Sequence, residues 1–150
     1  MSKEVWTIGV YPPCPRCDLT RQRIERLTKE MNTTVNVKKL IYTDPEVLEF
    51  AASIGKETGT AKDVAQRTGI EIDWNHLATV NNKPQIHPED IDIIDGPARR
   101  WSPEFDEVLR PCQEKAESLG LLMTPIVVVD GEVKHNGSVP SIEQLRSWLS

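Results

Sequence analysis

Two cysteines separated by two residues, Cys14 and Cys17, are the side chains of this sequence with the clearest capacity for chemistry. They follow a short apolar run and precede a pattern of apolar and charged residues that is typical of an amphipathic helix. A thiol at the beginning of a helix lies beside unpaired backbone N–H groups and the positive end of the helix dipole, and both lower its pKa. We therefore predict that Cys14 is a reactive thiolate. Cys17, one turn along the same helix, is placed to attack a mixed disulfide formed at Cys14.

The two residues between the cysteines, in the motif CPRC, are predicted to tune this dithiol. Pro15 stiffens the turn and suits the first position of a helix, where a missing N–H has no cost. Arg16 adds a positive charge beside Cys14, and this charge also favours the thiolate.

A structural disulfide and a metal site are the other interpretations of this pair. A structural disulfide does not suit a reducing compartment, and a structural zinc site usually has four ligands. The remaining candidate ligands, none of which has the spacing of a metal motif, are Cys112, His76, His87 and His135. The position before a helix favours redox chemistry. A soft metal or metalloid bound by Cys14, Cys17 and Cys112 stays as the alternative function.

The segments around the dithiol predict a strand, a helix and a second strand. Residues 5–11, with the sequence VWTIGVY, are apolar enough for a buried strand. The amphipathic pattern predicts a helix over residues 15–30. Residues 34–42 are rich in β-branched side chains and predict the second strand. A helix that joins two strands of one sheet implies a parallel, right-handed βαβ unit.

The C-terminal part predicts an antiparallel addition to the same sheet. Residues 126–129 are a continuous apolar run, and the dipeptide Asp130-Gly131 is a strong signal for a two-residue hairpin turn. A shorter strand follows over residues 132–135. Ser141 is predicted to cap a final amphipathic helix.

The middle of the chain differs in composition and pattern from the two ends. We expect a helix from Pro45 to Gly55, a short helix around residues 60–69, and then an irregular stretch rich in Pro, Asn and Asp. Residues 102–120 are helical in pattern, and Pro111 is expected to kink or restart that helix. A restart would put Cys112 in a first turn near the dithiol, as a third redox thiol or metal ligand. A buried apolar cysteine is the favoured interpretation.

Composition sets the class of protein. With 150 residues, 38% hydrophobic and 27% charged, the chain is typical of one globular domain. The net charge of -5 argues against nucleic acid as a partner, and no apolar run is long enough to span a membrane. The first residues lack the pattern of a secretory signal, and three cysteines is an odd number for a disulfide-stapled secreted domain. We therefore expect a cytoplasmic protein.

Three motifs together, CPRC, MTPIVVVDGEV and NGSVPS before the last helix, resemble the thioredoxin superfamily, and most closely its small thioredoxin- and glutaredoxin-like redox-active disulfide proteins. The resemblance covers residues 4–42 and about 111–149. It implies an α/β, thioredoxin-like fold: a mixed four-stranded sheet with helices on both faces. The chain would be a single domain over residues 1–150, with a partly helical insertion at about 44–110.

The resemblance also implies the activity of a thiol-disulfide oxidoreductase, with Cys14 attacking and Cys17 resolving. A cis Thr-Pro peptide would face the dithiol, and the backbone beside it would pair with the substrate. The residues expected to bind substrate are Thr124, Pro125, Pro15 and Arg16. No organic cofactor is implied. The expected partners are protein or small-molecule disulfides, with a reductase or another dithiol as the electron donor.

This sequence departs from thioredoxins at two positions beside the dithiol. Pro13 stands where thioredoxins have a Trp, directly before Cys14, and Ile8 stands near the position of their buried Asp. Both departures are closer to glutaredoxin-like electrostatics.

Overall fold

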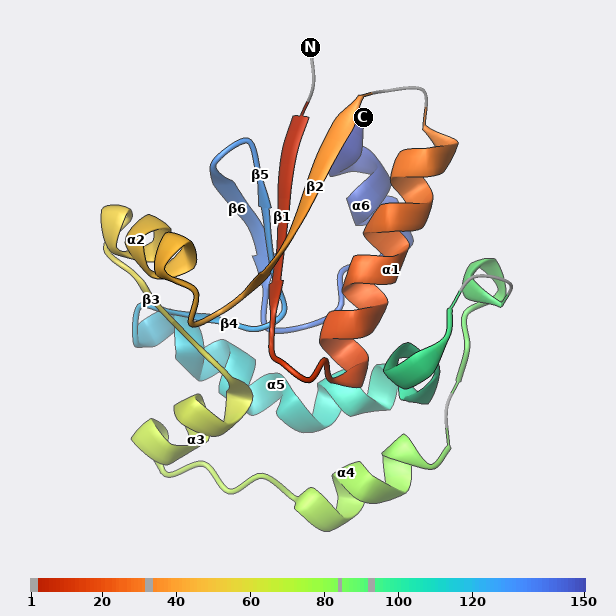
Figure 1. Ribbon diagram of the computed structural model, residues 1–150. Coiled ribbons are helices and arrows are strands. Elements are labelled where there is room, and N and C mark those ends of the chain that lie inside the picture. The colour runs from red at the N-terminus through yellow and green to blue at the C-terminus, as the bar shows by residue number, and fades with distance from the viewer. Residues whose placement is uncertain (1–2, 32–33, 84, 92–93) are drawn as a thin grey trace.

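The main sheet of the molecule has four strands. The structure is a computed structural model that describes residues 3–31, 34–83, 85–91 and 94–150. The strands lie in the order β2-β1-β5-β6, with bounds β1 (Lys3–Gly9), β2 (Val35–Ile41), β5 (Ile126–Val129) and β6 (Glu132–Asn136). β1 runs parallel to β2 and antiparallel to β5, and β5 pairs with β6 as an antiparallel hairpin (Figure 1). This mixed sheet confirms the predicted fold class.

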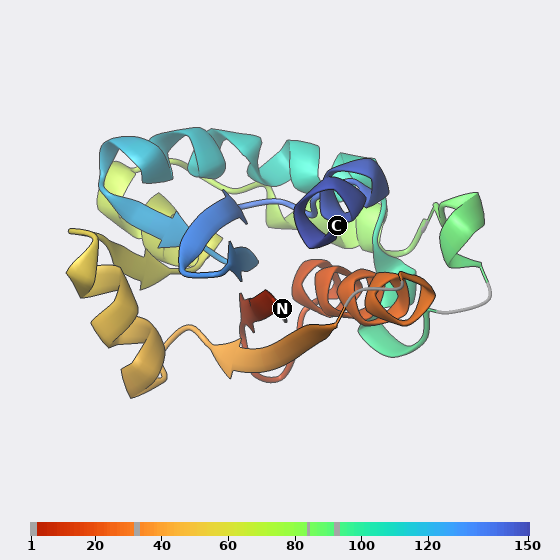
Figure 2. The same cartoon turned by 90° about the horizontal axis from the view of Figure 1, so that it is seen from above.

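Helices cover both faces of the sheet. On one face, α1 (Pro15–Glu30) and α6 (Ile142–Leu149) pack side by side, and α2 (Pro45–Ser53) lies on the other (Figure 2). The first core combines Val5, Val127 and Val129 of the sheet with Ile24, Leu27, Ile142, Leu145 and Leu149 of the helices. The second joins Ile8, Leu40, Ile126 and Val128 to Leu122 and to Val47 and Ala51 of α2. Alternate residues of β1 and β5 therefore serve different cores, as the pleat of a strand requires.

Local signals account for the C-terminal hairpin and helix. All four residues of β5 are buried, as expected for a strand covered on both faces. Asp130 and Gly131 have φ values of 49° and 79°, and two positive φ angles in succession are what a tight hairpin turn of this hand needs. The Ser141 side chain accepts from the Gln144 backbone N–H, while the Gln144 side chain accepts from the Ser141 N–H. This reciprocal cap begins α6 where the sequence predicted it.

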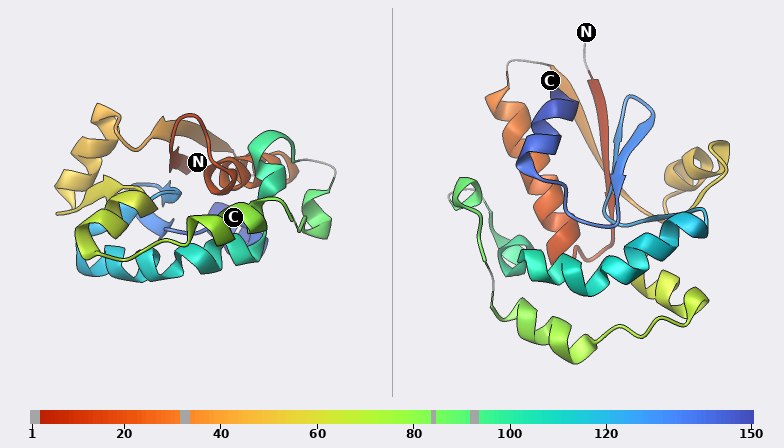
Figure 3. Two further views of the ribbon diagram at one scale, coloured as in Figure 1. Left: turned by 90° about the horizontal axis from the view of Figure 1, so that it is seen from below. Right: turned by 180° about the vertical axis from the view of Figure 1, so that it is seen from behind.

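Between β2 and β5 the chain forms a series of short elements and one long helix. They are α2, β3 (Glu57–Gly59), α3 (Ala61–Thr68), α4 (Trp74–Asn81), the 3-10 helices η1 (Pro88–Asp90) and η2 (Gly96–Arg100), α5 (Pro103–Ser118) and β4 (Leu121–Met123). β3 and β4 pair in parallel as a separate two-stranded sheet. α5 crosses the end of the main sheet near the beginning of α1 (Figure 3).

One expectation for this region was wrong, and one of two alternatives at Pro111 is excluded. The stretch predicted to be irregular contains α4, which begins where the Asp73 carboxylate accepts from the His76 backbone N–H. The helix predicted over residues 102–120 does not restart at Pro111, because α5 is continuous through it. A proline inside a helix removes one hydrogen bond. Here buried contacts hold the helix on both sides of Pro111. Leu109 packs with Val80 and Phe105, and Cys112 and Ala116 pack in a second cluster with Val64, Leu121 and Met123.

Residues from the middle of the chain pack against α1 and form an ion pair with it. Leu19 packs in a buried cluster with Ile94 and Ala98. A buried ion pair joins Arg23 of α1 to Asp90 of η1, with Nη2 and Oδ2 2.8 Å apart. These contacts hold residues that are distant in sequence against the helix that carries the dithiol. Within the described part of the chain, no helix has the length and apolar character needed to cross a membrane.

Candidate active site

Cys14 is the N-cap of α1. Its backbone is extended, with φ -85° and ψ 166°, and Pro15 occupies the first helical position, as predicted. The backbone N–H of Cys17 points at the Cys14 sulfur, with N and Sγ 3.5 Å apart. The Cys14 side chain therefore takes the place that a serine or aspartate oxygen fills in ordinary helix caps. A sulfur in this position gains most from such a donor when it carries a negative charge.

The two thiols have opposite pKa shifts. The pKa of Cys14 is lowered to about 6, chiefly by the hydrogen bond from the Cys17 thiol. The Cys17 backbone N–H and the charge of Arg16 act in the same direction, and partial burial opposes them. The pKa of Cys17 is raised, first by that same hydrogen bond and then by its burial. The pair therefore shares one proton near neutral pH, with the negative charge on the half-buried Cys14 and the proton on the buried Cys17.

The last residue of β1 determines how closely Cys17 approaches the sheet. A Cβ atom on Gly9 would lie 2.8 Å from the Cβ of Cys17 and 3.1 Å from its sulfur. Only glycine leaves room for the helix at this point. A cavity of about 210 Å³ opens beside Cys17 and is lined also by Thr7, Tyr11, Lys39, Ile41 and Asp44. Ile8 is buried in the second core.

Arg16 is buried rather than presented to a substrate. Its side chain is 4% exposed, and its Nε donates to Oδ1 of Asp106 at 2.6 Å. The two terminal nitrogens donate to backbone carbonyls, Nη1 to Thr124 at 3.5 Å and Nη2 to Gly137. The expectation of direct substrate contact by this side chain does not fit the geometry, because the guanidinium is used for contacts inside the protein.

Thr124 and Pro125 lie just before β5, and the peptide bond between them is cis. Both residues are buried. The Thr124 backbone N–H donates to the carbonyl of Gly59 at 3.0 Å, which extends the pairing of β3 with β4. Since Arg16 occupies the Thr124 carbonyl, both polar backbone groups of Thr124 have partners within the chain. The Thr124 backbone, which was expected to pair with a substrate peptide, is therefore paired with Gly59 in this structure.

Cys112 packs in a hydrophobic cluster that contains neither Cys14 nor Cys17. It is 1% exposed and packs with Val64, Ala116, Leu121 and Met123. Burial raises its pKa, which disfavours the thiolate. The structure thus gives Cys112 the surroundings of a core residue. In the part of the chain that is described, no three His, Cys, Asp or Glu side chains gather in a way that would hold a metal ion.

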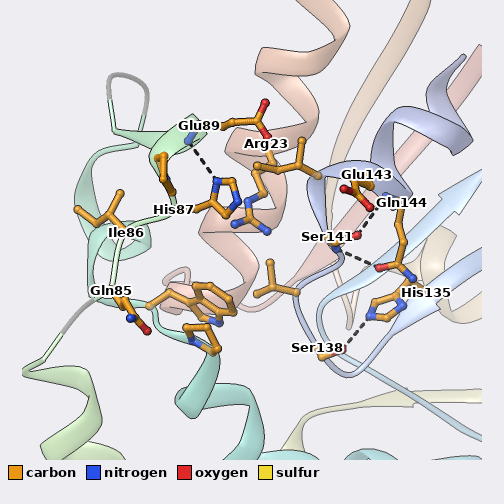
Figure 4. Close-up of a pocket in the computed structure, with 15 residues that line it drawn as sticks. Arg23, Gln85, Ile86, His87, Glu89, His135, Ser138, Ser141, Glu143 and Gln144 are labelled. Carbon is orange, nitrogen blue, oxygen red and sulfur yellow. Dashed lines mark hydrogen bonds between the residues drawn. The ribbon is translucent and has the colours of Figure 1, made fainter.

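A cavity of about 780 Å³ lies between η1, the beginning of α5 and the turn before α6 (Figure 4). His87 and His135 enter it from opposite sides. The His87 Nδ1 accepts from the Glu89 backbone N–H, and the His135 Nε2 lies 2.8 Å from the Ser138 hydroxyl. Burial lowers the pKa of His135, so this ring is neutral near pH 7. Neither Cys14 nor Cys17 lines this cavity.

Asp106 is the residue near the dithiol that the sequence did not reveal. Besides Arg16, its carboxylate accepts from the Trp101 indole N–H at 3.2 Å and from the Val139 backbone N–H at 3.1 Å. Asp106 is 90 residues from Arg16 in the chain and lies in the first turn of α5. Its only local signal was its place in an acidic first turn, which is an ordinary feature of helices.

A family model described as a thioredoxin domain matches residues 102–150. The solved structure of the oxidoreductase DsbA from Xylella fastidiosa is a distant likeness, with a TM-score of 0.34 and 16% identity over 97% of this chain and 81% of that chain. No curated protein matched the sequence. The mixed sheet with helices on both faces has a thioredoxin-like architecture, and residues 102–150 are similar to a thioredoxin domain.

Proposed function

We propose that this protein is a thiol-disulfide oxidoreductase in which Cys14 is the attacking thiolate and Cys17 the resolving thiol. The observation that carries the proposal is the position of the Cys14 sulfur at the N-cap of α1, with the Cys17 N–H directed at it and its pKa lowered to about 6. At pH 7 such a thiol is about nine-tenths ionised, compared with a few per cent for an ordinary cysteine.

The exchange follows from the different burial of the two sulfurs. The Cys14 thiolate attacks one sulfur of a substrate disulfide, which forms a mixed disulfide and releases the other substrate sulfur as a thiolate that takes up a proton. Cys17 then loses its proton and attacks the Cys14 sulfur. This step releases the second substrate thiol and leaves a Cys14–Cys17 disulfide. Two electrons have passed from the protein to the substrate, and a reductase or another dithiol must return them.

Formation of the mixed disulfide also changes the electrostatics at Cys17. The hydrogen bond and the charge of the Cys14 thiolate are main causes of the raised Cys17 pKa. Both disappear when the Cys14 sulfur becomes part of a disulfide. The pKa of Cys17 then falls, so the resolving thiol becomes reactive at the moment when it is needed.

The proposed substrates are protein or small-molecule disulfides. Pro13 and Pro15 flank Cys14 and are partly exposed, and Tyr11 nearby is 77% exposed, so an incoming disulfide meets this surface first. We place further docking at the Thr124–Pro125 backbone. A substrate strand can pair there only after Gly59 releases the Thr124 N–H. A cytoplasmic location, as expected from the sequence, suits a protein that must be kept reduced.

The test is to trap the mixed disulfide. Cys17→Ser is incubated with an asymmetric aromatic disulfide, and the adduct is located by mass spectrometry of peptides. We expect one stable adduct on Cys14, whereas the wild-type protein releases both halves of the reagent and becomes oxidised. Cys112→Ala serves as the control and should turn over like the wild type. An adduct on Cys112, or none on Cys14, would contradict the assignment.

A further inference from the structure

Arg16 is held by three different parts of the chain. Asp106 is on α5, Thr124 precedes β5, and Gly137 follows β6, and each accepts a hydrogen bond from the Arg16 guanidinium. Arg16 itself lies between the two cysteines, in the first turn of α1. A charged side chain that is 4% exposed needs such partners, because an unpaired buried charge is costly.

Asp106 completes this arrangement with both of its oxygens. Oδ1 accepts from Arg16 Nε, while Oδ2 accepts from the indole of Trp101 and from the backbone N–H of Val139. Val139 belongs to the turn that follows Gly137, whose carbonyl accepts from Arg16. One carboxylate therefore fixes both the arginine inside the CPRC motif and the turn that the same arginine contacts.

We propose that Asp106 is a positioning residue for the dithiol: it holds Arg16 in place beside Cys14 and partly neutralises the positive charge that Cys14 experiences. The inference rests on the proposed function. It gives α5, which carries Asp106, a role in the redox site. The CPRC motif itself contains only the arginine of this pair.

The sign of the effect follows from the charges. Arg16 stabilises the Cys14 thiolate, and the Asp106 carboxylate at 2.6 Å from Arg16 Nε weakens this attraction. Removing the negative charge while Arg16 remains must therefore lower the pKa of Cys14 further. Removing both charges must raise it above the wild-type value. If Asp106 only stabilised the fold, its removal would not lower the pKa of Cys14, and removal of both charges would not raise it.

Other titratable or charged groups that interact with this pair need to be considered. His135 and Cys112 interact electrostatically with Arg16, and His135 and Arg110 do so with Asp106. The pKa of Cys112 is raised, so this thiol is neutral over the range in which Cys14 titrates. The pKa of His135 is lowered by burial, and Asp106 favours its charged form. Loss of the Asp106 charge therefore only reduces the positive charge on His135, which would raise the Cys14 midpoint rather than lower it. Arg110 lies on the exposed side of α5 and keeps its charge throughout. The change in the Cys14 titration therefore reports on Arg16 and Asp106.

The experiment compares two isosteric substitutions in the reduced protein. Asp106→Asn changes the proposed residue, and Asp90→Asn changes another buried carboxylate that comes from outside α1 and pairs with one of its arginines. Alkylation rates of Cys14 are measured from pH 4 to 9. For Asp106→Asn we expect the midpoint to fall by about half a unit, which raises the rate at pH 5 about threefold. For Asp90→Asn we expect the wild-type midpoint, with a comparable loss of thermal stability.

A double variant keeps the test decisive if Asp106→Asn folds poorly. Arg16→Gln with Asp106→Asn replaces both charges by amides that can still bond to each other, and we expect its Cys14 midpoint to rise above the wild-type value. An unchanged midpoint in both Asp106 variants, or the same shift in Asp90→Asn, overturns the inference. Because alkylation needs no substrate, failure of the mixed-disulfide trap would refute the proposed function without affecting this result.

Discussion

Substitution of Gly9 by alanine tests how tightly the sheet determines the position of the resolving thiol. The new Cβ would lie 2.8 Å from the Cβ of Cys17 and 3.1 Å from its sulfur. Carbon atoms in contact prefer about 3.5–4.0 Å, so the overlap is about 0.7–1.2 Å. A change of rotamer moves the Cys17 sulfur but not its Cβ. The beginning of α1 must therefore shift away from β1.

Two consequences are expected for Gly9→Ala. Overpacking of this kind costs about 1–3 kcal/mol in the free energy of unfolding, which lowers the melting temperature by several degrees. The shift of α1 also weakens the hydrogen bond from the Cys17 N–H to the Cys14 sulfur, now 3.5 Å long. We therefore expect a higher Cys14 pKa and slower resolution of a mixed disulfide. Thermal unfolding and stopped-flow thiol exchange measure the two effects.

Gly69→Ala is the matched control for this experiment. A Cβ at this position would meet no atom within 4 Å, but the backbone has a φ of 74° at the end of α3. Alanine there costs about 1–2 kcal/mol through backbone strain alone. It should lower the stability and leave both thiols unchanged. The reasoning is refuted if Gly9→Ala keeps wild-type stability and exchange rates, or if Gly69→Ala impairs exchange equally.

Three further predictions concern stability and the other thiol. Cys112→Ala should lose about 1 kcal/mol of stability, because a buried sulfur is removed from an apolar cluster, and should leave the alkylation of Cys14 unchanged. The stability of the reduced protein relative to Cys14→Ser should increase between pH 6 and pH 9, because the folded-state pKa of Cys14, about 6, lies below its ordinary value of 9.0. This gain disappears as the pH falls through 6. Denaturant titrations at several pH values measure it, and a difference in stability that does not change with pH would contradict the prediction. Leu145→Ala, in the core under α6, should cost about 2–5 kcal/mol by chemical denaturation, and a loss below 1 kcal/mol would contradict the packing described.

Local sequence signals were sufficient to predict the strand and the helix that carry the dithiol. The apolar run of β1, the proline that begins α1 and the Asp130-Gly131 turn each have a short-range physical cause. The structure has the proline and the turn where they were predicted, whereas β1 begins and ends two residues earlier than the predicted strand over residues 5–11. The parallel pairing of β1 with β2 and the antiparallel pairing of β5 with β6 followed from their connections, a helix in the first case and a two-residue turn in the second.

The contacts around Arg16 were not predictable in the same way. An arginine in a turn is usually exposed, and only its distant partner Asp106 explains its burial. β3 and β4 were missed for a similar reason. Each has three residues, too few for a pattern, and their pairing joins positions 57–59 to positions 121–123. The helix α4 has few strong helix formers, Leu77 and Ala78 in eight residues, although Asp73 before it was a usable capping signal.

The occupied backbone of Thr124 also depends on a distant contact. The sequence motif indicated an edge that would receive a substrate, but the Gly59 carbonyl that pairs with it is supplied by the middle of the chain. A motif can show which residues form a site. It does not show which other segment of the same chain lies against them.

The most direct test of the central claim is the pH dependence of Cys14 alkylation in the reduced wild-type protein, with Cys14→Ser as the reference. The account predicts a single fast-reacting thiol, absent from the variant, with a midpoint near pH 6. A midpoint at 8.5 or above, or a fast thiol that persists in Cys14→Ser, would contradict a stabilised thiolate at the beginning of α1 and with it the proposed exchange chemistry.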